Sequence, residues 1–280
     1  MTLPYLEQPV WRIGPATVSL FQVLILAGYA AGYWLCLRRA ARAGVAMDSM
    51  HRWIAFVALG AMLGAVLFKN MYLTPRPSLV ALRFAGISSF GGIWGAVAAS
   101  ALYGGYRRQS LSEWLRQLNV LAYAFPVALL LGRVGCALAH DHPGIRGTGL
   151  LAVAYPGGPR YDLAAIEVLF LLPLSAVFLL LGRTAGDRPF AGWFLTVYGP
   201  FRIWLDRLHE SAPQGWLGQN IDAWAGLLSL LCGVGLLLAP HRRRGAVATI
   251  EAKESRCWES PPTSRSRETA ERQSPSTNRR

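Results

Sequence analysis

Seven apolar runs, each near the length that crosses a lipid bilayer, constrain this chain more than any other feature of its sequence. About 20 consecutive apolar residues span the hydrocarbon core as a helix. With 280 residues that are 53% hydrophobic and only 15% charged, the chain has the composition of a multi-span membrane protein. We predict an all-α integral membrane protein with one domain over residues 1–240 and about seven transmembrane helices. The runs are 16–37, 53–68, 88–106, 118–139, 163–182, 190–206 and 221–239.

The two ends of the chain differ from this body. Residues 1–14 hold no basic region followed by a cleavage site, so we expect the first run to remain as a span. Residues 241–280 contain ten basic and five acidic residues, with much Ser and Pro and no apolar periodicity. We predict a disordered basic tail that contacts anionic lipid. The formal charge of +13 therefore does not indicate a nucleic-acid partner.

Basic residues are unevenly divided between the two sets of loops, and this bias indicates an orientation. The segments after the first, third, fifth and seventh runs carry Arg38, Arg39, Arg42, Arg52, Arg107, Arg108, Arg116, Arg183, Arg188, Arg242, Arg243 and Arg244. The other side carries fewer, namely Arg12, Lys69, Arg76, Arg83, Arg146, Arg160 and Arg207. Because Lys and Arg favour the cytoplasmic side, we predict an outside N-terminus and a cytoplasmic C-terminus.

Two arginines lie inside apolar runs, where a charge is least favoured. Arg133 is within Val127–Ala139, and Arg202 is within Phe194–Leu205. A charge at the centre of a membrane helix opposes insertion by about 2.5–3.5 kcal/mol, so each arginine should face a polar cavity or an anionic partner. In the predicted orientation both lie toward the outer leaflet. They indicate an anion site, with a lipid phosphate as the obvious ligand; snorkelling or structural pairing is the alternative.

The fifth and sixth runs carry further polar residues. Tyr198, Arg202 and Asp206 follow one another at intervals of four, so they lie along one face of a helix. We expect Tyr198 and Asp206 to orient Arg202, with the Tyr198 hydroxyl one turn deeper; a purely structural Arg–Asp pair is the alternative. Glu167 is an acid in an apolar segment and needs a partner, for which Arg133 is a candidate.

Two more sequence patterns lie on the predicted outer side of the membrane. Gly91 and Gly92 permit a close approach, either of a lipid headgroup or of a neighbouring helix. His140, Asp141 and His142 follow the fourth run and suit acid–base chemistry, unless they form an ordinary solvated loop. Two histidines two positions apart, without further ligands nearby, are a weak metal pattern, so we predict no metal site.

The chain resembles the bacterial prolipoprotein diacylglyceryl transferases in short motifs that keep their order across the seven runs. The resemblance extends over nearly all of the runs and leaves out the tail. The motifs are Ile13-Gly14-Pro15, Arg38-Arg39, Ser89-Phe90-Gly91-Gly92-Ile93-Trp94-Gly95, Gly132-Arg133-Val134-Gly135 with Gly144, Glu167, Tyr198-Gly199-Pro200-Phe201-Arg202, and Gly218-Gln219.

This resemblance implies an enzyme of the bacterial plasma (inner) membrane whose site faces the outer leaflet. Such an enzyme takes the diacylglyceryl group from phosphatidylglycerol and attaches it to the lipobox cysteine thiol of a lipoprotein precursor, releasing glycerol 1-phosphate. Its partners are this lipid and the precursor's signal peptide, and it needs no cofactor. The residues expected to contact phosphatidylglycerol are Arg133, Arg202, Gly91, Gly92, Gly144 and Glu167.

Four positions depart from the family pattern. The family usually has His, Asn, Tyr and Glu where this chain has Phe90, Cys136, Phe21 and Asp206. A phenylalanine cannot do what a His or a Tyr does, so the substitution at Phe90 puts the activity in question. We therefore predict that His140 or His142 supplies a displaced base, and that Tyr198 and Asp206 complete the catalytic set.

Two other function classes remain open. The first is a non-catalytic paralogue that binds lipid or signal peptides, which the loss of the usual His favours. The second is a different membrane enzyme acting on lipid phosphates through His140 and His142, with or without a metal, and chelator sensitivity would distinguish it. A transporter is less favoured, because the sequence has no internal repeat and no interrupted pair of helices.

Overall fold

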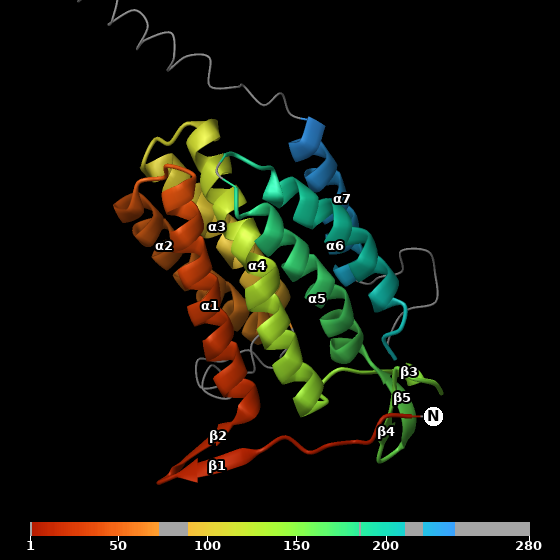
Figure 1. Cartoon of the computed structure of the whole chain (residues 1–280). Coiled ribbons are helices and arrows are strands. Elements are labelled where there is room, and N and C mark those ends of the chain that lie inside the picture. The colour runs from red at the N-terminus through yellow and green to blue at the C-terminus, as the bar shows by residue number, and fades with distance from the viewer. Residues whose placement is uncertain (1, 73–88, 185, 211–220, 239–280) are drawn as a thin grey trace, which may run out of the picture. The chain divides into compact units, whose positions relative to one another are not determined.

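A computed structural model describes residues 2–72, 89–184, 186–210 and 221–238. Within these ranges the chain forms seven helices, each overlapping one apolar run, which confirms the helical prediction (Figure 1). Four of them, α1, α2, α4 and α5, are long and apolar enough to cross a membrane. The number of spans and the orientation stay predictions. The helices are α1 (Leu20–Arg42), α2 (Met47–Tyr72), α3 (Ser89–Tyr106), α4 (Leu111–Ala139), α5 (Leu163–Leu181), α6 (Phe190–Asp206) and α7 (Ile221–Leu238).

Local signals explain where three helices begin. Ser19 caps α1 and Ser110 caps α4, each in a capping box with the residue three positions on. Asp162 caps α5 by accepting a hydrogen bond from the backbone N–H of Ala165. These side chains satisfy N–H groups that a first helical turn leaves without partners.

Five short strands accompany the helices, and the all-α prediction did not include them. β1 (Val10–Ile13) and β2 (Ala16–Ser19) form an antiparallel hairpin. β3 (Pro143–Arg146), β4 (Ala152–Tyr155) and β5 (Gly158–Asp162) form an antiparallel sheet in the order β3-β5-β4. All five lie at the end of the helices where α1 begins and α4 ends (Figure 1). Segments of four or five residues are too short to show a periodic pattern in sequence.

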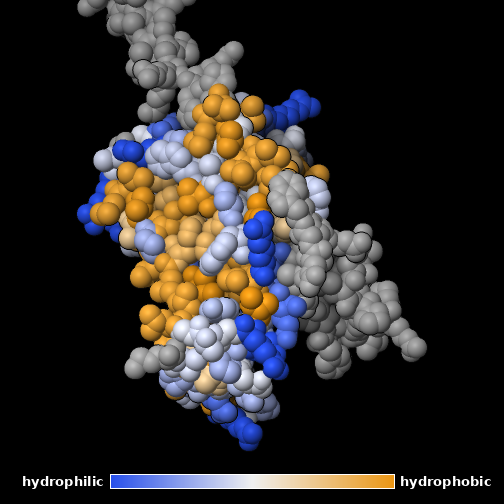
Figure 2. Space-filling view, turned by 90° about the vertical axis from the view of Figure 1, so that its right-hand side faces the viewer, coloured by the Kyte–Doolittle hydropathy of each residue, from blue (hydrophilic) through white to orange (hydrophobic). Residues whose placement is uncertain are grey.

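The helices pack in pairs around an aromatic core. The most extensive contacts join α1 to α4, α2 to α3 and α6 to α7, with α5 against α4. Trp53, Tyr123, Phe178 and Phe190 are buried together in this core. Outside it, apolar side chains form a broad band over the helices, with hydrophilic side chains around the strands (Figure 2). An apolar exterior of this kind suits contact with lipid.

Glycines bring α2 and α3 into direct backbone contact. A Cβ added to Gly64 would lie 2.3 Å from the carbonyl oxygen of Gly91, and one added to Gly95 would lie 2.1 Å from that of Gly60. A Cβ on Gly92 would meet only ordinary contacts, the nearest being 3.5 Å away. The geometry therefore gives Gly64 and Gly95 a role in helix packing, with the backbone of Gly91 at the contact, whereas headgroup binding by Gly91 and Gly92 stays a prediction.

We expect Gly95→Ala to lower the free energy of unfolding by about 1–3 kcal/mol, because the new methyl overlaps the backbone of Gly60 and forces α2 and α3 apart. Gly105→Ala is the matched control on the same helix, since a Cβ there meets nothing within 4 Å. Thermal unfolding of the purified protein in detergent measures both. Equal stability of the two variants would contradict this account of the α2–α3 contact.

Candidate functional site

Three helices place charged side chains on one buried carboxylate. Glu167, in the second turn of α5, is 1% exposed. Its Oε2 lies 2.9 Å from Nε of Arg133 on α4 and 3.6 Å from Nη1 of Arg202 on α6. The predicted pairing of Glu167 with Arg133 is confirmed, and Arg202 joins it. All three residues lie toward the ends of their helices that adjoin the strands.

The second oxygen of Glu167 is also occupied. The hydroxyl of Tyr198, one turn before Arg202 on α6, donates to Oε1 of Glu167 over 2.6 Å. The sequence predicted that Tyr198 would act on Arg202, whereas the structure directs its hydroxyl to the carboxylate that Arg202 contacts. Asp206, the last residue of α6, is buried. Because both oxygens of Glu167 are engaged, the Glu167 carboxylate is held in a single position.

His142 lies next to this cluster. Its Nε2 is 3.4 Å from Nη1 of Arg133, and its Nδ1 is 2.5 Å from Oδ1 of Asp141. A guanidinium only donates hydrogen bonds, so Nε2 of His142 accepts from Arg133. Nδ1 therefore carries the ring hydrogen and donates a hydrogen bond to Asp141. This arrangement is a neutral imidazole oriented by a carboxylate, which is the form that a general base requires.

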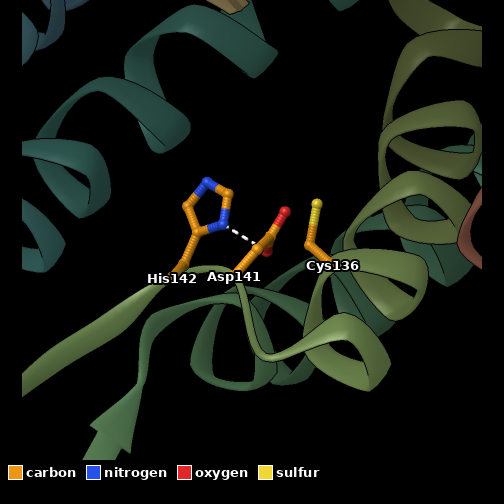
Figure 3. Close-up of side chains that lie close together, drawn as sticks. All are labelled: Cys136, Asp141 and His142. Atoms are coloured by element: carbon orange, nitrogen blue, oxygen red, sulfur yellow. Dashed lines mark hydrogen bonds and ion pairs between the residues drawn. The ribbon is translucent and has the colours of Figure 1, made fainter. Parts of the chain in front are cut away.

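Cys136, Asp141 and His142 come together at the end of α4 (Figure 3), with possible ligand atoms within 4.8 Å of one another. Three such side chains could in principle hold a metal ion. The Arg133 guanidinium, however, lies beside His142, with its Nη1 3.4 Å from Nε2 of that ring. A fixed positive charge at that distance opposes cation binding. The geometry fits proton transfer better than metal coordination.

His140 is separated from this group although only Asp141 stands between it and His142. Its Nδ1 is 2.8 Å from Oδ2 of Asp162, and its Nε2 is 3.2 Å from the carbonyl oxygen of Leu6. Both partners accept, so the protonated imidazole satisfies both contacts. The ring also stacks on Tyr5 with centroids 4.2 Å apart. His140 therefore ties the N-terminal segment to the sheet and is poorly placed to accept a proton.

Asp162 is the centre of this second cluster, and the sequence reasoning missed it. The Tyr155 hydroxyl donates to Asp162 over 3.0 Å, and burial together with the Asp162 charge raises the pKa of Tyr155 above its ordinary value. The sequence did hold a signal for the capping role of Asp162, because an aspartate directly before an apolar run is a helix-start pattern. Nothing in the local sequence indicated that Asp162 contacts His140.

Gly144 also has a packing role. A Cβ there would lie 2.6 Å from the carbonyl oxygen of Leu208 and 2.8 Å from a methyl of Leu163. Arg160 donates to the Gly144 carbonyl over 3.3 Å. The glycine lets β3 pack closely on the chain that follows α6, and its contact with a lipid stays a prediction.

Several predicted features lie outside the described residues. These are the side chain of Phe90, the Gly218-Gln219 pair and the basic tail 241–280. Among described residues, the chemical capacity of the site rests on two arginines, one glutamate and a neighbouring His–Asp pair. The two guanidinium groups and the single carboxylate together carry one formal positive charge, so the cluster favours an anion with a forked oxygen arrangement, such as a phosphate.

Comparison with known proteins gives a consistent result. The family model described as prolipoprotein diacylglyceryl transferase matches residues 8–239. A phosphatidylglycerol–prolipoprotein diacylglyceryl transferase of Nitratidesulfovibrio vulgaris is 29% identical over 88% of this chain and 97% of its own. A relative of the same name from Pseudoalteromonas translucida is 28% identical over 87% of this chain and 96% of its own. Another from Geobacter sulfurreducens is 27% identical over 85% of this chain and 92% of its own. The resemblance noted in the sequence is confirmed.

We expect Glu167→Gln to destabilise the protein by about 3–5 kcal/mol, because it leaves two partly buried guanidinium groups without their counter-charge. Tyr198→Phe removes only one hydrogen bond to that carboxylate, so the expected loss is about 1–3 kcal/mol. Thermal unfolding in detergent measures both variants.

Tyr103→Phe is the control for the tyrosine variant. Tyr103 is buried on α3, and its hydroxyl has no hydrogen-bond partner among the described residues. Removing that hydroxyl should leave the unfolding temperature unchanged. Equal effects of Tyr103→Phe and Tyr198→Phe would contradict a structural role for the Tyr198–Glu167 hydrogen bond.

Proposed function

We propose a function from one premise: the chain belongs to the prolipoprotein diacylglyceryl transferase family. The proposed reaction transfers the diacylglyceryl group of phosphatidylglycerol to the lipobox cysteine thiol of a lipoprotein precursor. The observation that carries the proposal is the convergence of Arg133 and Arg202 on the buried Glu167. This arrangement presents paired guanidinium groups inside an apolar bundle, as recognition of a lipid phosphate requires.

In the reaction, the thiol sulfur attacks the carbon of the diacylglyceryl group that is bonded to the phosphate oxygen. A carbon–sulfur bond forms while the carbon–oxygen bond breaks, and the electron pair leaves with the phosphate oxygen as glycerol 1-phosphate. Arg133 and Arg202 stabilise the negative charge that develops on this leaving group. Glu167, held by Tyr198, keeps both guanidinium groups in position before the lipid binds.

The thiol must lose its proton to become a good nucleophile, because its ordinary pKa is near ~8.5. His142 is the base we propose. Its Nδ1 donates to Asp141, which leaves Nε2 to accept the proton. Asp141 then stabilises the imidazolium. We prefer His142 to His140 because both ring nitrogens of His140 face acceptors, Asp162 and the Leu6 carbonyl, and so have no lone pair free for the thiol proton.

The position of Phe90 supports a displaced base. Phe90 is the second residue of α3, and the family usually has a histidine at that point of the motif. With that imidazole missing, the thiol proton needs another acceptor. His142 is proposed to take over this task from the end of α4.

We also propose that the site opens to the outer leaflet of the bacterial plasma membrane and that the precursor's signal peptide is the second partner. The unequal distribution of basic residues supports this orientation. The helix ends that carry Arg133, Glu167 and Arg202 adjoin the strands, on the side with fewer basic residues.

Two alternatives keep specific support. The substitution at Phe90 favours a paralogue that binds lipid or signal peptides without transfer. The proximity of Cys136, Asp141 and His142 is the observation behind a metal-dependent enzyme acting on lipid phosphates, although the nearby Arg133 charge opposes cation binding. Both are outcomes of the assay below.

The first assay combines the purified protein, phosphatidylglycerol vesicles and a lipobox peptide, with mass spectrometry of the cysteine. We expect a diacylglyceryl mass gain, and a rate loss of about 10²–10³ in Arg133→Lys, which keeps the charge but loses the forked donors. Arg146→Lys, exposed on β3, is the matched control and should keep the full rate.

The other outcomes identify the alternatives. No mass gain, beside a working family enzyme under the same conditions, would support the binding paralogue. Transfer that stops in EDTA and returns with a divalent metal would support the metal-dependent reading. A full rate in Arg133→Lys would contradict the phosphate clamp.

A second prediction separates the two histidines. His142→Gln should lower kcat by about 10²–10⁴ while leaving the unfolding temperature unchanged, because it removes a proton acceptor from a partly exposed position. His140→Gln should instead destabilise the protein by about 1–3 kcal/mol and keep the activity of the molecules that fold. Transfer rates and thermal unfolding, measured on the same preparations, test this. The reverse pattern would exclude His142 as the base.

A further inference from the structure

A cavity lined by positive charges lies at the opposite end of the helices from the Arg133–Glu167–Arg202 cluster. Its volume is about 330 Å³, and it lies where α1 and α5 end, away from the strands. Three arginines contribute to its walls, together with apolar and aromatic side chains, and none of the described acids lines it. The lining residues are Trp34, Leu35, Arg38, Arg42, Tyr123, Leu179 and Arg183.

The three arginines are held in different ways. The Arg38 guanidinium lies over the ring of Trp34, 4.5 Å from its centroid. Arg42 donates to the carbonyl oxygen of Gly182 over 3.2 Å. Arg183 forms no ion pair with any described residue. None of these contacts neutralises a guanidinium, so the cavity keeps three positive charges on its wall.

Arg39 adds a further positive charge near the cavity, with its guanidinium 5.8 Å from the ring centroid of the lining residue Tyr123. It is buried and donates to the backbone carbonyls of Gly182, Thr184 and Gly186. These bonds fix the chain after α5, which carries Arg183. Carbonyl groups are dipoles without net charge, so Arg39 adds to the attraction for an anion.

The geometry points to a second anionic-lipid site: this cavity binds the phosphate of an anionic phospholipid from the leaflet at that end. A lipid fits better than a free phosphate because Trp34, Leu35 and Leu179 form an apolar wall beside the charges. Tryptophan is also the residue that favours the membrane–water interface. The site is separate from the proposed Arg133–Arg202 clamp and does not depend on it.

The test uses full-length protein in detergent and native mass spectrometry with phosphatidylserine or phosphatidylcholine as the probe. Arg38→Gln combined with Arg183→Gln should weaken phosphatidylserine binding by about tenfold or more, given the usual attraction of each basic residue to anionic headgroups. Arg52→Gln combined with Arg107→Gln removes the same charge from the same end outside the cavity, and it should leave binding unchanged.

Two further binding measurements identify the chemical class of the ligand. Phosphatidylcholine binding should be equal in all variants, and millimolar inorganic phosphate should not displace phosphatidylserine. Equal losses in the two double variants would reduce the site to a general charge effect and overturn it. Displacement by inorganic phosphate would overturn the lipid assignment. Diacylglyceryl transfer by the Arg38→Gln/Arg183→Gln variant should continue, which keeps this result distinct from the fate of the proposed reaction.

Discussion

The contact of Glu167 with two arginines is the interaction on which the rest of the structure depends. Arg133 and Arg202 belong to apolar helices that resist a lone charge, and they lie close enough together to repel each other. One carboxylate on α5, engaged at both oxygens, removes most of this cost. Because the three charges leave one positive in excess, the cluster that stabilises the bundle also retains affinity for an anion. In the proposed function, stability and lipid recognition thus depend on the same atoms.

Much of the helical architecture could be predicted, because a run of about 20 apolar residues has few alternatives to a membrane helix. The pairing of Glu167 with Arg133 followed from the cost of burying either charge alone. The strands could not be predicted, since four or five residues are too few for a pattern. Nor could the contact of Tyr198 with Glu167, because spacing along α6 identifies a shared face but not the neighbouring helix that this face meets.

The different environments of His140 and His142 have a conformational cause. His140 ends α4 in a left-handed conformation, with φ of 52°, and the chain reverses there toward β3. Its side chain therefore meets Asp162 and the N-terminal segment, whereas His142 meets Arg133. Sequence spacing placed both near the arginine but carried no information on this turn. A single backbone conformation separates a structural histidine from one suited to chemistry.

The contact between Arg133 and His142 connects the two halves of the proposed reaction. While no phosphate is bound, the guanidinium donates toward Nε2 and occupies the lone pair that a base needs. A lipid phosphate is a stronger acceptor than a neutral imidazole, so it should draw this donor away. Nε2 then becomes able to take the thiol proton when the leaving group is already held. In a chain with Phe90 in place of the usual histidine, binding of the lipid would thereby prepare the base that replaces it.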